Sequence, residues 1–126
     1  MKNLDVNLKV IASSGGSSAL SSAKKFGFCE ATTNLDLIFD DDSIDSVVIA
    51  TRHNTHAELI IRALNSGKNI FVEKPLALTL DEIEKISQAY EKNNSSQIMI
   101  GFNRRFSPFV VRIKELIDSS NCPRSM

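Results

Sequence analysis

Cysteine, net charge and long apolar runs are all scarce in this sequence. Its two cysteines, Cys29 and Cys122, lie far apart and outside any C-x-x-C motif, so neither a disulfide framework nor a zinc knuckle is expected. Because 15 basic side chains balance 15 acidic ones, no long-range field favours nucleic acid or an anionic membrane as a partner. No apolar run approaches the roughly 20 residues that span a bilayer, and residues 1–5 lack the hydrophobic region of a signal peptide. These absences predict a soluble cytoplasmic protein with free thiols.

The residues that are present predict one α/β domain. With 126 residues and 42% hydrophobic content, the chain is large enough for a single packed core. Short runs of β-branched residues alternate with longer segments of helical spacing, which is typical of βαβ units. Strands are predicted at 8–12, 46–50, 69–72 and 97–100, with a weaker edge strand at 28–31. Their nearly continuous apolar character indicates strands covered on both faces.

Helices are predicted between these strands and after the last one. Capping boxes at Thr55 with Glu58 and at Thr79 with Glu82 mark two helix starts, and Gly27 and Gly67 mark helix ends. The predicted helical ranges are 19–26, 35–39, 57–64, 83–90 and 108–117. With right-handed crossovers, this alternation predicts a doubly wound open parallel sheet with helices on both faces.

Ligands of such sheets bind beyond the carboxyl ends of the strands, and a Ser/Gly cluster at 13–18 follows the first predicted strand. Backbone N–H groups and hydroxyls around Ser13 and Ser14 suit a phosphate or ribose. A flexible connection with a serine N-cap explains the cluster equally well, because it is neither a G-x-G-x-x-G turn nor a Walker motif. No acidic residue lies at the end of this strand, where one would bind the ribose hydroxyls of NAD. The site could therefore also accept the 2'-phosphate of NADP, and the choice of cofactor stays open.

A second strand end carries the dense polar loop 51–56. Its hydroxyls, guanidinium, imidazoles and amide indicate a small-molecule site; they belong to Thr51, Arg52, His53, Asn54, Thr55 and His56. No metal is expected, because no cysteine or aspartate lies near the two histidines to complete a ligand set. The alternative for His56 is that it packs within the first turn of the following helix.

The two remaining strand ends also carry charge. Lys74, between Glu73 and Pro75, could contact substrate hydroxyls and move a proton, or it could form a surface ion pair. Beyond the last strand, Asn103 and Arg105 lie in a segment that could bind carboxylate or phosphate, the alternative being a solvated turn. The acidic run 40–45 is interpreted as a solvated loop at the opposite edge of the sheet.

Together these segments resemble the glucose-fructose oxidoreductase, inositol dehydrogenase and rhizopine-catabolism family. The resemblance rests on residues 45–51, His56, residues 63–77 and residues 101–108, and it covers the chain from about Leu8 to Leu116. The loop Arg52–His56 looks especially like the variant fused behind a zinc-type alcohol dehydrogenase module.

The resemblance implies a Rossmann domain that binds NAD or NADP in an oxidoreductase acting on a sugar, polyol or sugar nucleotide. Lys74 matches the lysine that contacts the reacting hydroxyl and assists proton transfer. The cofactor-binding residues it implies are Ser13, Ser14, Thr51, Arg52, His53, Asn54, His56, Glu73, Lys74, Pro75, Asn103 and Arg105.

The chain also departs from the family pattern. The resemblance implies a preceding strand with a G-x-G-x-x-G turn and a following second domain, and this sequence has neither. The domain is therefore expected to be incomplete, with a flexible tail at 119–126 and little activity of its own. Since the preceding strand would lie at the sheet centre, the strands at 8–12 and 46–50 are expected to pair directly or with another chain, a homo-oligomer included.

Two other functions remain open. One is a non-catalytic binding or regulatory remnant of the same domain. The other is a flavodoxin-like or receiver-type domain, which would require the acidic run 40–45 at the carboxyl ends of the strands.

Overall fold

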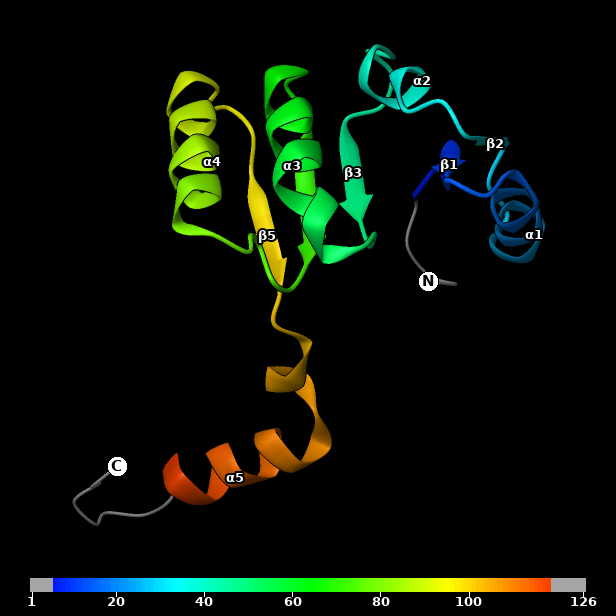
Figure 1. The fold of residues 1–126 in the computed structure, drawn as a ribbon. Coiled ribbons are helices and arrows are strands. Elements are labelled where there is room, and N and C mark those ends of the chain that lie inside the picture. The colour runs from blue at the N-terminus through cyan, green and yellow to red at the C-terminus, as the bar shows by residue number, and fades with distance from the viewer. Residues whose placement is uncertain (1–5, 119–126) are drawn as a thin grey trace.

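The computed structural model describes residues 6–118, and the predicted alternation of strands and helices is confirmed (Figure 1). The expected tail at 119–126 lies outside the described residues. The elements are β1 (Val10–Ala12), α1 (Gly16–Phe26), β2 (Glu30–Thr32), α2 (Asp36–Phe39), β3 (Ser46–Ile49), the 3-10 turn η1 (His53–Thr55), α3 (His56–Asn65), β4 (Asn69–Glu73), α4 (Leu80–Lys92), β5 (Ile98–Gly101), the 3-10 turn η2 (Asn103–Phe106) and α5 (Pro108–Asp118). No helix in the described part of the chain is long and apolar enough to cross a membrane.

The strands form two separate parallel sheets rather than one. β1 pairs with β2, and β3, β4 and β5 form a three-stranded sheet in that order. The parallel α/β class is thus confirmed, whereas direct pairing of β1 with β3 is wrong. A side-chain contact connects the two parts instead: Lys9, just before β1, has its Nζ 2.5 Å from an oxygen of Asp41 in the loop before β3. Hydrogen bonds from Lys9 and Ser43 hold the pKa of Asp41 well below its usual range.

The main core lies between the three-stranded sheet and helices α3 and α4, which cover one of its faces (Figure 1). Val47 and Ile49 are buried on this face, but Val48 between them is 70% exposed. Met99 on β5 is 58% exposed. The prediction that these strands are covered on both faces is therefore wrong for the described residues. The physical reason is that α5 projects beyond the strand ends and leaves the second face bare (Figure 1).

The helix ends agree with the sequence except at one position. Thr79 and Glu82 form the predicted capping box, and Gly27 and Gly67 end their helices at positive φ. Thr55 makes no side-chain cap, so the box predicted with Glu58 is wrong. The reason is that Thr55 already has helical backbone angles in η1, and its hydroxyl bonds back to the Arg52 carbonyl.

The acidic run 40–45 precedes β3 and so lies at the amino ends of the strands, as predicted. Lys68, 2% exposed, fastens this loop by donating to the carbonyl oxygens of Asp41 and Ile44 at 2.9 and 2.8 Å. This position excludes the receiver-type arrangement, which needs the acidic cluster at the carboxyl ends.

Candidate functional site

Three of the four predicted site segments meet at one edge of the molecule. Because β3, β4 and β5 are parallel neighbours, the loop Thr51–His56, the turn Glu73–Leu76 and the segment Gly101–Phe106 all begin at the carboxyl edge of this sheet (Figure 1). The fourth segment, at 13–18, follows β1 in the other sheet. The structure therefore brings Lys74 together with the loops of β3 and β5, but not with Ser13 and Ser14.

Glu73 ends β4 and is held by a side chain of η2, the turn that follows the neighbouring strand β5. Its Oε1 accepts a hydrogen bond of 2.8 Å from the Asn103 side chain. Lys74 is exposed and has no ion pair among the described residues, so the alternative of a Glu73–Lys74 surface pair is not what the structure contains. Sequence reasoning predicted Glu73 and Asn103 as separate site residues. It did not predict their contact, because the pairing register of β4 and β5 cannot be derived from the sequence.

Gly101 makes this close approach possible. It pairs with Glu73 across the sheet, and a Cβ at Gly101 would lie 3.0 Å from Glu73 Oε2 and 3.1 Å from Phe71 Cζ. Real Cβ atoms rarely come that close, so the glycine is needed for space and not for its backbone angles. The feature of the sequence that could have predicted this role is a glycine at the end of an otherwise β-branched and apolar strand.

We expect Gly101→Ala to displace the Glu73 carboxylate and weaken its bond to Asn103. Overpacking of this kind typically costs about 1–3 kcal/mol. Urea denaturation measures the loss, and Gly16→Ala is the matched control, because a Cβ there meets only a Thr33 methyl group at 3.7 Å. Equal stability of the two variants would contradict the role assigned to Gly101.

The loop after β3 presents polar side chains to solvent. Thr51 and Thr55 share a hydroxyl–hydroxyl bond of 2.7 Å, which closes the loop into the η1 turn. Arg52, His53 and Asn54 are exposed, as a ligand-binding loop requires. Among the described residues, no group of three or more histidine, cysteine, aspartate or glutamate side chains is placed to hold a metal ion.

His56 differs from its neighbours because it has no exposed surface. Its Nδ1 lies 2.7 Å from the Pro75 carbonyl oxygen, and its Nε2 lies 3.1 Å from the Thr51 carbonyl oxygen. The His53 ring packs against it edge-on at 5.6 Å between centroids. The imidazole thus joins the β3 loop to the turn that carries Lys74.

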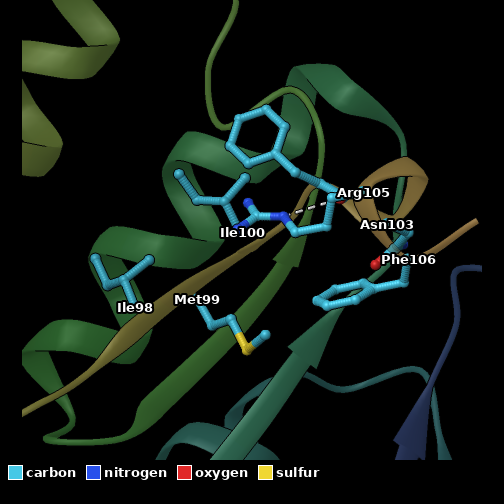
Figure 2. A pocket seen from close by; sticks show the side chains of 7 residues that line it. Ile98, Met99, Ile100, Asn103, Arg105 and Phe106 are labelled. Carbon is cyan, nitrogen blue, oxygen red and sulfur yellow. Dashed lines mark hydrogen bonds between the residues drawn. The ribbon is translucent and has the colours of Figure 1, made fainter. Parts of the chain in front are cut away.

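Arg105 lies beside a shallow hollow of about 320 Å³ at the end of β5 (Figure 2). Its Nε donates to the Phe102 carbonyl oxygen at 3.2 Å, and its guanidinium lies 5.6 and 5.8 Å from the ring centres of Phe102 and Phe106. The hollow lies against β5 and η2 and includes Met99 of the bare sheet face. A guanidinium held in this way can bind a carboxylate or phosphate.

The Ser/Gly cluster forms the start of α1. Ser13 and Ser18 share a hydroxyl–hydroxyl bond of 2.8 Å, and the Ser18 hydroxyl donates to the Gly15 carbonyl oxygen at 2.6 Å. Gly15 is the N-cap residue, so no side chain caps the first N–H groups of this helix. Those groups are the ones that anions bind at helix N-termini.

Comparison with known proteins places these features in a family. A model of an oxidoreductase family with an NAD-binding Rossmann fold matches residues 2–102. The levoglucosan dehydrogenase of Pseudarthrobacter phenanthrenivorans is 39% identical over 110 residues, which are 87% of this chain and 28% of that protein. An inositol 2-dehydrogenase of Rhizobium meliloti is 36% identical over 116 residues, 92% of this chain and 34% of that one. The chain thus spans about a third or less of these relatives.

Solved structures agree with the sequence comparison. A levoglucosan dehydrogenase in complex with NADH and levoglucosan superposes with a TM-score of 0.76 at 38% identity, over 88% of this chain and 30% of that one.

Proposed function

Because the chain belongs to the oxidoreductase family with an NAD-binding Rossmann fold, we propose that the whole protein transfers hydride between NAD or NADP and a hydroxyl of a sugar-like substrate. Similarity to an inositol and a levoglucosan dehydrogenase supports a cyclic polyol or an anhydrosugar, and a sugar nucleotide is a further candidate. The single observation that carries the proposal is the exposed Lys74 at the end of β4, the middle strand of its sheet, between two polar loops.

The described residues fit two parts of a dinucleotide. The exposed side chains of Arg52, His53 and Asn54 supply donors and acceptors for the nicotinamide ribose, and Arg105 supplies a cation near the same edge. The uncapped start of α1, with Ser13 and Ser14 before it, suits the adenosine ribose or a 2'-phosphate. The sequence contains no G-x-G-x-x-G turn, so we assign no pyrophosphate contact to it.

In the proposed reaction, Lys74 Nζ contacts the substrate hydroxyl and accepts or returns its proton. When bound, the nicotinamide ring supplies the hydride acceptor or donor. Glu73, held by Asn103, fixes the end of β4 immediately before Lys74. Pro75, held by His56, fixes the turn immediately after it.

Titration of the chain with NADH and with NADPH tests the cofactor part of this proposal. We expect saturable binding detected by calorimetry, weakened about tenfold or more in Arg105→Ala if that guanidinium contacts the cofactor. Arg112→Ala is the matched control, because Arg112 is exposed on α5 and pairs with Glu115. Absence of binding to the unaltered chain would favour the alternative of a non-catalytic remnant.

We also propose that the open edges of β1 and β3 pair with an extended segment of another chain, a second copy included. Among the described residues, β1 pairs only with β2 and β3 only with β4, and unpaired strand edges promote association. Sedimentation of the chain over a range of concentrations tests self-association. A monomer at every concentration would rule out a second copy as the partner.

Two finer parts of the proposal rest on sequence. The loop Arg52–His56 supports a relation to the variant fused behind a zinc-type alcohol dehydrogenase module, and the gene sequence upstream tests it. A cytoplasmic location is supported by the free thiol of Cys29, and cell fractionation tests it.

A further inference from the structure

His56 is the first residue of α3, and its surroundings are mostly apolar. The next residues on the buried side of the helix, Ala57 and Ile60, belong to the main core. An aliphatic side chain would fill this position without the cost of burying a polar ring. The structure instead contains an imidazole with each nitrogen directed at a backbone carbonyl oxygen.

Both partners of the ring are acceptors, so each contact is a hydrogen bond only when the facing nitrogen carries a proton. The Nδ1 contact with Pro75 is 2.7 Å and the Nε2 contact with Thr51 is 3.1 Å. For a ring with a single proton, we assign that proton to Nδ1, the nitrogen with the shorter contact. The bond to Pro75 is therefore the firmer of the two.

The Pro75 carbonyl belongs to the turn that carries Lys74, whose own side chain has no ion pair among residues 6–118. Asn103 holds the residue before Lys74 through its bond to Glu73, and His56 holds the residue after Lys74 through its contact with the Pro75 carbonyl oxygen. Because His56 has no exposed surface, its ring holds this bond without contacting solvent or a ligand.

We propose that His56 is a positioning residue that fixes the Lys74 turn through the hydrogen bond from Nδ1 to the Pro75 carbonyl. Its effect on catalysis rests on the proposed function, whereas the bond itself does not. A displacement of about 1 Å in a reacting group can lower turnover about 100-fold, so the bond controls kcat rather than cofactor affinity.

Two amide variants separate the two ends of the ring. In His56→Asn the side-chain N–H₂ takes the place of Nδ1 and keeps the bond to Pro75. In His56→Gln it takes the place of Nε2, which reaches toward Thr51 and leaves Pro75 without a donor. The two substitutions bury similar amide groups, so a role in packing alone predicts similar losses in both.

In the whole protein, assayed with NAD and a cyclic polyol, we expect His56→Gln to lower kcat about 10–100-fold. The kcat of His56→Asn should stay within about threefold of that of the unaltered protein. The dissociation constant for NADH should change less than about threefold in either variant. Equal kcat in the two variants, or a loss confined to NADH affinity, would overturn the positioning role. If the unaltered protein oxidises no sugar or polyol, the proposed function fails and not the bond.

Carbonyl chemical shifts test the bond without cofactor or substrate. The ¹³C shift of the Pro75 carbonyl, detected through the Leu76 amide, should move in His56→Gln and stay nearly constant in His56→Asn. Hydrogen exchange at the histidine rings of the unaltered chain is a further test, and it depends on neither variant. The His56 ring N–H should exchange slowly with water, in contrast to that of the exposed His53, and fast exchange at both rings would overturn the proposal.

Discussion

Replacing Lys74 with methionine is expected to lower kcat for polyol oxidation about 10²–10⁴-fold, the usual contribution of a positioned acid or base. Methionine keeps much of the length of the side chain and removes the amino nitrogen that we place at the substrate hydroxyl. Because Lys74 is exposed and has no ion pair among the described residues, the substitution should leave the fold intact. The measurement is the initial rate of NADH formation in the natural protein, together with NADH affinity.

Lys85→Met is the matched control for this experiment. Lys85 is an exposed lysine on α4 that pairs with Asp81 at 2.7 Å and belongs to none of the three segments of the site. Its replacement should leave kcat within about twofold, since exposed pairs of this kind contribute about 0–1 kcal/mol to stability. If Lys74→Met retains the turnover of the control, Lys74 does not carry the proton.

Leu64→Ala is expected to lower the free energy of unfolding by about 2–5 kcal/mol. Leu64 is 0% exposed and lies on α3, which packs against β3, β4 and α4. The loss is a large share of the roughly 5–15 kcal/mol that stabilises an ordinary domain. Urea denaturation followed by circular dichroism measures it.

Leu80→Ala makes the same change at an exposed position. Leu80 is 87% exposed at the first turn of α4, so we expect a change within about 0.5 kcal/mol. Similar losses in the two variants would show that α3 is not the centre of the core. The carboxyl edge of the three-stranded sheet would then not depend on the packing of α3 for its stability.

The order of the elements was predictable because each strand and helix is signalled by its own residues. Apolar spacing on Ile60 and Leu64, and the Thr79–Glu82 capping box, are local patterns that the structure confirms. The bare sheet face was not predictable in this way. Val48 and Val47 are the same residue type, and only the placement of α3 and α5 decides which of them is covered.

The site was predictable in location but not in detail. The rule that ligands bind at the carboxyl ends of parallel strands placed Thr51, Lys74 and Asn103 at one edge. The contacts between these segments join residues 19 and 30 positions apart, as in His56 with Pro75 and Glu73 with Asn103. Such contacts depend on register and on side-chain direction, which no local pattern contains.

The separation of the two sheets also divides the molecule into parts that open independently. Every residue of the main core cluster, with its packed neighbours, lies between Leu35 and Ile100, so β1 and β2 are outside it. A pair of strands covered only by α1 is weakly stable by itself. Backbone amides of β1 should therefore exchange hydrogen through local opening, whereas those of β4 should exchange only when the domain unfolds globally. A single melting midpoint would accordingly describe the larger part of the molecule and not the part that holds Ser13 and Ser14.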